Sequence, residues 1–138
     1  MTDVFYIALG SNLGNRELAL MRARAAIGAI RDTRLIGASE VEETEPIGPV
    51  QQGKFLNQMV AISTTLAPRT LLAALHRIER AAGRVRVSRW GPRTLDLDIV
   101  MQEGKDYCDD ALVIPHPELP NRDFWQRELA QLRGITDE

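Results

Sequence analysis

Runs of apolar residues rich in strand formers recur four times along the chain. They predict β-strands over four ranges: 4–9, 34–43, 55–63 and 95–101. Turn-prone segments separate them, including the cluster 10–15 after the first run and the proline-rich loop 45–49 after the second.

Between these runs, two stretches carry apolar residues at helical spacing. The first follows Asn15, a plausible N-cap, and its apolar face comprises Leu20, Ala23, Ile27 and Ile30. The second begins at Pro68, is expected to end near Gly83, and buries Leu71, Leu75 and Ile78. Residues 124–132 predict a short terminal helix.

The resulting order is strand, helix, strand, strand, helix, strand. This order is typical of the ferredoxin-like βαββαβ sandwich, an α+β fold in which helices pack on one face of an antiparallel sheet. We therefore expect one domain spanning residues 1–138, with long active-site loops and the second face of the sheet free for ligands.

Composition narrows the function only slightly. The 138 residues are 44% hydrophobic and 26% charged with a net charge of −2, so nothing global favours nucleic acid or an anionic membrane. A single cysteine, Cys108, fits a reducing compartment. The N-terminus lacks the pattern of a signal peptide and no apolar run is long enough to span a bilayer, so the expected location is the cytoplasm. The oligomeric state is not indicated.

The most informative short motif is the acidic pair Asp96 and Asp98. In a strand, residues i and i+2 point to the same face, so both carboxylates project together while Leu95, Leu97 and Ile99 point into the core. Two neighbouring negative charges favour a cation between them, and oxygen ligands suit Mg²⁺. Taken alone, the pair could also be two acids on a solvated sheet edge.

An arginine-rich loop precedes this pair. Residues 84–93 contain four arginines, whose planar guanidinium groups match phosphate oxygens. Arginines beside paired metal-binding aspartates favour phosphoryl transfer. The arginines could instead pair with surface acids or bind RNA, although the chain lacks an aromatic-rich RNA-binding strand motif and the aspartates would repel a phosphate backbone.

The segment 89–99, Arg-Trp-Gly-Pro-Arg-Thr-Leu-Asp-Leu-Asp-Ile, resembles the signature of the 6-hydroxymethyl-7,8-dihydropterin pyrophosphokinase family of folate biosynthesis. Four shorter segments resemble the same family in the same order, at residues 6–14, at 43–49 together with 55–57, at 114–117 and at 121–124. The resemblance implies a ferredoxin-like enzyme that transfers pyrophosphate from ATP to the pterin hydroxymethyl group and releases AMP.

The resemblance also implies roles for individual residues. Catalytic positions would be Arg84, Arg93, Asp96 and Asp98, with two Mg²⁺ ions held by the two aspartates. Nucleotide-binding positions would be Glu79, Arg86, Trp90, Ile99, His116 and Arg122. Pterin-binding positions would be Thr44, Ile47, Phe55, Asn57 and Phe124, with the two phenylalanines sandwiching the ring.

Several of these positions also have a purely structural explanation. Phe55 and Phe124 could simply pack in the core, and Glu79 with His76 could lie on a solvated helix face. For the whole chain, the alternatives are a paralogue that acts on a modified pterin and a non-catalytic module that binds a nucleotide or a pterin.

Overall fold

A five-stranded antiparallel sheet forms the centre of the molecule, in the order β2–β4–β1–β5, with β3 paired to the beginning of β4. The computed structural model describes residues 1–83 and 94–136. Its sheet strands are β1 (Asp3–Ser11), β2 (Thr33–Ala38), β3 (Glu42–Thr44), β4 (Phe55–Thr64) and β5 (Asp96–Gln102). This strand order, with a helix after β1 and another after β4, confirms the ferredoxin-like α+β fold.

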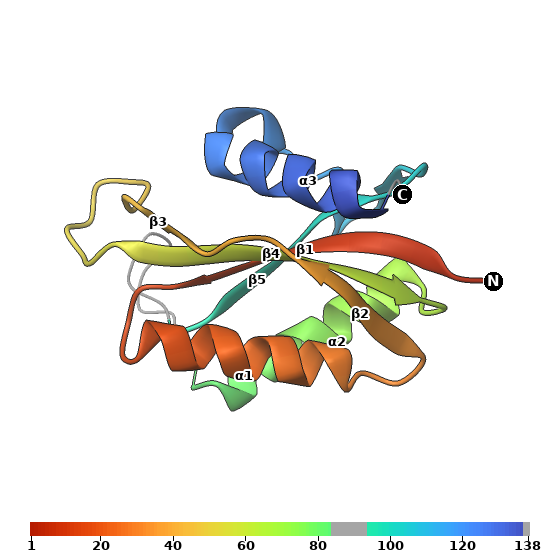
Figure 1. Cartoon of the computed structure of the whole chain (residues 1–138), viewed down its shortest axis with the longest axis horizontal. Helices are drawn as coiled ribbons and strands as arrows, with labels where there is room; N and C mark the ends of the chain where they lie inside the picture. Colours follow the sequence, from red (N-terminus) through yellow and green to blue (C-terminus); the bar gives the residue numbers. More distant parts are fainter. Residues whose placement is uncertain (84–93, 137–138) are drawn as a thin grey trace.

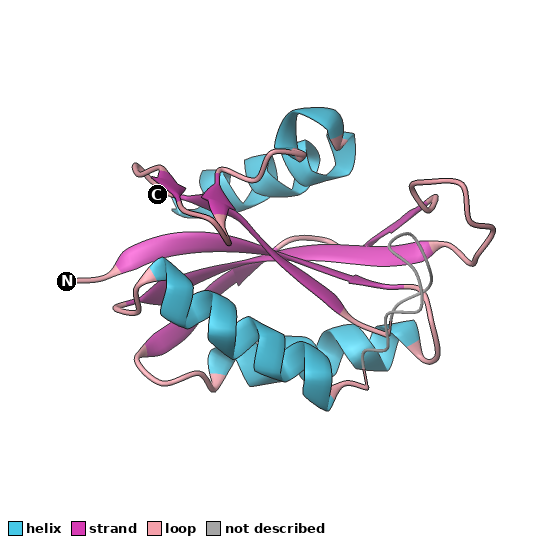
Figure 2. Cartoon of the chain, turned by 180° about the vertical axis from the view of Figure 1, so that it is seen from behind, coloured by secondary structure: helices cyan, strands magenta, loops and turns pink. Residues whose placement is uncertain are grey.

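Helices cover both faces of this sheet (Figures 1 and 2). Helices α1 (Arg16–Gly28) and α2 (Pro68–Ala81) pack on one face, and α3 (Asp123–Thr136) lies on the other. A small hairpin, β6 (Tyr107–Cys108) and β7 (Val113–Ile114), and the short 3₁₀ helix η1 (Leu119–Asn121) connect β5 to α3. No helix within residues 1–83 and 94–136 is long and apolar enough to cross a membrane.

Local signals in the sequence explain where the first two helices begin and end. The Asn15 side chain accepts a hydrogen bond from the backbone N–H of Leu18 at 3.1 Å, which caps α1 as expected. Pro68 occupies the first turn of α2, and Gly83 adopts a positive φ of 79° directly after its C-cap. The predicted face of α1 is buried except for Ile30, which lies beyond the end of the helix and is partly buried.

The hydrophobic core has two layers, one on each side of the sheet. Residues of β1 such as Phe5 and Ile7 pack against α1 and α2, whereas Tyr6 and Ala8 pack toward α3. Trp125, Leu129 and Leu132 supply the α3 side of the second layer. Because both faces are covered, β1 is a nearly continuous apolar run with no polar alternation.

Two expectations from the sequence need correction. The predicted strand 34–43 is interrupted at Ser39, because the Ser39 hydroxyl accepts the Met59 N–H at 2.9 Å and the Gln58 side chain donates to the Ser39 carbonyl at 2.7 Å. The Ser39 side chain thus replaces a backbone acceptor in the hydrogen bonding between the two strands, and the strand resumes as β3. The second face of the sheet is also not free, because α3 covers part of it.

Candidate active site

One cleft is lined by residues of the second sheet face next to α3 and also by residues of α2 on the first face. It has a volume of about 840 Å³, within the range of small-molecule sites. Its walls come from β1, β3, β4, β5, α2, α3 and the segment 109–118. Eleven of the residues expected to bind substrate, nucleotide or metal line it: Thr44, Ile47, Phe55, Asn57, Glu79, Asp96, Asp98, Ile99, His116, Arg122 and Phe124.

The acidic pair lies at the cleft floor, as the strand pattern predicted. Asp96 is paired with Gly10 and Asp98 with Ala8 across β1, so small residues stand beside both carboxylates. Leu97, which lies between them in sequence, points to the opposite face and is buried in the core. Both aspartates are half-buried, with the Asp98 side chain 30% exposed, and they lie on β5 at one edge of the sheet.

His116 stands beside Asp98, with 3.8 Å between its Nε2 and the Asp98 Oδ1. Its Nδ1 accepts a hydrogen bond from the Glu118 N–H at 3.0 Å, so in the neutral ring the proton lies on Nε2 and faces the carboxylate. Burial, with the charge of Arg122 adding to it, lowers the pKa of His116. The neutral ring also makes an edge contact with Trp125, at 5.0 Å between centroids.

Arg122 extends this side of the cleft. Its guanidinium carbon lies 4.3 Å from the centroid of the Trp125 ring, a cation–π contact that orients the side chain. Its Nε is buried and has no hydrogen-bond partner in the described part of the chain. A buried donor without a partner is costly, so an anionic ligand in the cleft would satisfy it.

Glu79 does not lie on a solvated face of its helix, so that interpretation of the sequence is wrong. Its side chain is 3% exposed and accepts the Leu97 N–H at 2.7 Å. The bond ties α2 to the backbone of β5 between the two aspartates. His76, one turn earlier, is exposed and lines the same cleft.

The opposite end of the cleft holds an amide and two aromatic rings. Asn57 is 7% exposed, and its Nδ2 donates to the Thr44 Oγ1 at 2.5 Å. A Cβ added at Gly10 would lie 3.3 Å from the Asn57 Oδ1, so glycine leaves room for this amide. Phe55 and Phe124 are half-buried and line the cleft from β4 and α3, and Phe124 also packs against the core beside Trp125.

Four expected site residues belong to the arginine-rich loop: Arg84, Arg86, Trp90 and Arg93. They lie outside the described residues. The roles assigned to them stay predictions.

The sequence analysis did not single out the tip of the β6–β7 hairpin, whose residues 109–113 line the cleft. Asp109 shapes this tip: its Oδ1 accepts the N–H groups of Ala111 and Leu112 at 2.7 and 2.9 Å. The Tyr107 hydroxyl, with these amides, holds the pKa of Asp109 well below its usual range. The Asp109-Asp110 sequence is a turn signal that could have located the hairpin, although not its contact with the cleft.

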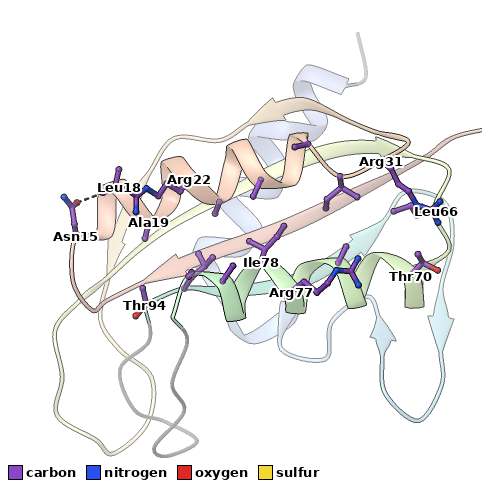
Figure 3. A pocket seen from close by; sticks show the side chains of 18 residues that line it. Asn15, Leu18, Ala19, Arg22, Arg31, Leu66, Thr70, Arg77, Ile78 and Thr94 are labelled. Carbon is purple, nitrogen blue, oxygen red and sulfur yellow. Dashed lines mark hydrogen bonds between the residues drawn. The ribbon is translucent and has the colours of Figure 1, made fainter.

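A second hollow lies between α1 and α2 on the other face (Figure 3). It has a volume of about 910 Å³ and is lined by apolar residues and by arginines such as Arg22 and Arg77. No carboxylate is among the described residues that line it. The carboxylates expected from the sequence to bind metal line the first cleft instead.

The donor set of the first cleft fits magnesium. Magnesium in nucleotide enzymes commonly takes one or two carboxylates and completes its shell with water and substrate phosphates. Asp96 and Asp98 supply such a pair. Within residues 1–83 and 94–136, no group of three or more acidic, histidine or cysteine side chains could hold a metal ion by itself.

The fold and the cleft together define a class: an α+β protein whose sheet face presents a metal-type carboxylate pair beside a pocket with an amide and two aromatic rings. Comparison with known proteins identifies the family. The family model for 7,8-dihydro-6-hydroxymethylpterin-pyrophosphokinase matches residues 6–134, and the chain belongs to this family.

Several curated relatives carry the same name, 2-amino-4-hydroxy-6-hydroxymethyldihydropteridine pyrophosphokinase. The Bacillus subtilis protein is 40% identical over 132 residues, covering 96% of this chain and 79% of its own length. The Pseudomonas aeruginosa protein is 43% identical over 133 residues, covering 96% and 82%. The Haemophilus influenzae protein is 43% identical over 119 residues, covering 86% and 74%.

Family membership confirms the expectation drawn from the motifs. The chain is a pyrophosphokinase that transfers pyrophosphate to the hydroxymethyl group of 6-hydroxymethyl-7,8-dihydropterin in folate biosynthesis. A non-catalytic binding module and a paralogue for a modified pterin are not favoured. Enzymes of this family use ATP and are generally magnesium-dependent.

Proposed function

We propose that the transfer takes place in the cleft between β5 and α3, with ATP beside the acidic pair and the pterin between Phe55 and Phe124. The observation that carries this proposal is that one cleft contains both a carboxylate pair and a ring-sized site with a buried amide. Between these two ends, the small residues Ala8 and Gly10 of β1 line the cleft.

The pterin end is supported by chemistry that suits a flat heterocycle. Stacking between aromatic rings is favourable, and the Asn57 amide offers both a donor and an acceptor to a ring edge. Because its Nδ2 already donates to the Thr44 hydroxyl, the orientation of the amide is set before ligand binds. Thr44 and Ile47 then contribute from the strand and loop that border this end.

At the phosphate end, Asp96 and Asp98 are proposed to hold two Mg²⁺ ions. Bound there, magnesium would neutralise phosphate charge and orient the β-phosphate for displacement. Arg122 would donate to a phosphate or ribose oxygen through its unpartnered Nε, and neutral His116 would donate from Nε2. Glu79 acts on the nucleotide indirectly, by holding the β5 backbone between the aspartates. Ile99 belongs to the same strand.

The proposed reaction is an in-line displacement. The pterin hydroxymethyl oxygen forms a bond to the β-phosphorus, the bond from that phosphorus to the α,β-bridging oxygen breaks, and AMP leaves as the hydroxyl proton is released. Arg84 and Arg93 are proposed to contact the phosphates during transfer, and Arg86 and Trp90 to contact the nucleotide.

The setting of the reaction follows from the same proposal. We infer that ATP and a reduced pterin are the ligands, that neither nucleic acid nor a membrane takes part, and that the enzyme acts in the cytoplasm as a single domain over residues 1–138. The oligomeric state is left open.

The decisive experiment measures which nucleotide accumulates. The protein is mixed with ATP, Mg²⁺ and 6-hydroxymethyl-7,8-dihydropterin, and AMP and ADP are separated by chromatography. Pterin-dependent AMP is expected, whereas ADP would contradict attack at the β-phosphorus. Asp98→Asn should abolish turnover, and Asp106→Asn, at an exposed acid after β5, is the matched control. Near-normal turnover by Asp98→Asn would remove the metal assignment.

A further inference from the structure

Helix α3 is tied to the short strand that borders the pterin end of the cleft. The Arg127 guanidinium bonds both carboxylate oxygens of Glu42 on β3, at 3.0 Å from Nε and 3.4 Å from the terminal nitrogen. One turn further along α3, the Gln131 Oε1 accepts the backbone N–H of Glu40 at 3.0 Å. Both ties hold the segment that contains β3 against the helix.

A buried acid completes this contact. Glu128 is 0% exposed, and as a carboxylate neither of its oxygens would have a hydrogen-bond partner in the described part of the chain. A protonated Glu128 would donate to the neighbouring Glu42 carboxylate, which would satisfy both groups. Burial first, and the hydrogen bond and charge of Glu42 next, raise the pKa of Glu128 to about 9, against the opposing charge of Arg127.

The charges around this acid come from two elements. Glu42 faces it from β3, and Arg127 neighbours it on α3, where Asp123 in turn acts on Arg127. At neutral pH the cluster therefore consists of the Glu42 carboxylate, the Arg127 guanidinium and the protonated Glu128 carboxyl, and Glu42 is the acceptor for the other two. The pair can bond in this way only while one of the two acids keeps its proton.

The register of the sheet connects this cluster to the cleft. Glu42 is paired with Asn57, and Thr44 with Phe55, so the side chains of all four lie on the face that α3 covers. Thr44 in turn accepts the hydrogen bond that orients the Asn57 amide. On the other side, Phe124 lies four residues before Glu128, on the same face of α3. The two walls of the pterin end thus meet at Glu42.

We propose that Glu42, held by Arg127 and the Glu128 carboxyl, is a positioning residue that sets the separation and alignment of the two walls of the pterin site. Within the described chain β3 has only three residues and pairs with β4, so these side-chain bonds add to the short ladder and to the Arg16–Glu43 bond in keeping Thr44 beside Asn57. Because the ties reach residues 40 and 42 and the aspartates lie on β5, the expected effect is on pterin affinity. This inference rests on the proposed placement of the pterin.

The first test compares two arginines on the same helix. Arg127→Ala removes the Glu42 contact, whereas Arg133→Ala removes a comparable ion pair with Glu103, at 2.9 Å, away from β3. We expect Arg127→Ala to raise the KM for pterin about 5- to 10-fold, with kcat and the KM for ATP within about twofold of wild type. Fluorescence titration of the pterin should show the same loss of affinity without turnover. Equal pterin affinities in the two variants would overturn the inference.

The second test uses the proton on Glu128. Glu128→Ala should weaken pterin binding, and Glu128→Gln should recover it, because an amide N–H₂ donates to Glu42 as the protonated carboxyl does. Above pH 9 the wild type should lose pterin affinity relative to Glu128→Gln at the same pH, which controls for titration of the pterin itself. Parallel pH profiles, or equal affinity in the alanine and glutamine variants, would contradict the role of this proton.

These outcomes are separable from a failure of the proposed function. If wild-type protein gives no pterin-dependent AMP, the reaction assignment fails. If wild-type protein is active and Arg127→Ala behaves like Arg133→Ala, the reaction stands and only the positioning role of Glu42 fails.

Discussion

Replacing Glu128 with glutamine should stabilise the protein, by an amount that depends on pH. The carboxyl has an ordinary pKa of 4.5 and a pKa of about 9 in the folded chain, so the folded state binds one more proton across this interval. Stability from this group is fully present below pH 4.5 and is lost progressively as pH rises toward 9. Glutamine keeps the hydrogen bond to Glu42 without requiring the proton.

The size of the effect follows from the same two values. Each pH unit above the unfolded pKa costs about 1.4 kcal/mol until the folded pKa is reached. At pH 7 the interval is about 2.5 pH units, so protonating Glu128 on folding costs on the order of 3 kcal/mol, which is an upper bound for the gain. Glu128→Gln should therefore change stability little at pH 4.5 and most near pH 8–9.

Chemical denaturation followed by circular dichroism at a series of pH values measures this directly. The difference in free energy of unfolding between Glu128→Gln and wild type should grow steadily from pH 5 to pH 8. Glu17→Gln, at an exposed acid in the first turn of α1, is the control and should give a difference that does not grow in this way. A constant or negative difference for Glu128→Gln over this range would refute the reasoning.

Three further predictions concern the cleft. Gly10→Ala should raise the KM for pterin several-fold and leave the KM for ATP unchanged, because the new methyl lies 3.3 Å from Asn57 Oδ1 and 3.5 Å from Phe55 Cδ1. Equal effects on the KM values of both substrates in steady-state kinetics would argue against placing the pterin beside Asn57. Arg122→Ala should raise the KM for ATP about tenfold or more, since it removes a charged hydrogen-bond donor, and an unchanged ATP affinity by calorimetry would remove it from the nucleotide site. Chelation of magnesium should stop turnover, while the fluorescence of the pterin should still show that it binds at the end of the cleft that contains Asn57. Turnover that persists in the presence of a chelator would contradict the metal role of Asp96.

The parts of the fold that could be predicted are those written in local patterns. Alternation at Asp96 and Asp98 placed both carboxylates on one face, and Asn15, Pro68 and Gly83 marked helix ends with side-chain and backbone preferences that act within one turn. Such signals need no knowledge of distant contacts.

The parts that could not be predicted depend on long-range contacts. The break at Ser39 arises because a hydroxyl replaces a backbone acceptor for Met59, twenty residues away. Burial of Glu79 depends on the Leu97 N–H of a strand beyond the next loop. Glu128 looks in the sequence like any polar position of a helix, and its burial arises from the packing of α3 on the sheet. The roles of residues 84–93 stay predictions.

The bond between Glu79 and the Leu97 N–H has a consequence for how the protein behaves in concentrated solution. β5 is the outer strand of the sheet, and an outer strand with unused backbone groups is a template for association with another chain. Here the Glu79 carboxylate accepts a hydrogen bond from the Leu97 N–H, and the His116 N–H donates to the Val100 carbonyl at 2.8 Å. Two of the backbone groups along this edge are therefore already engaged. The carboxylate that ties α2 to β5 thereby also protects the sheet from growing by strand addition, and loss of Glu79 would expose unpaired backbone groups along this edge.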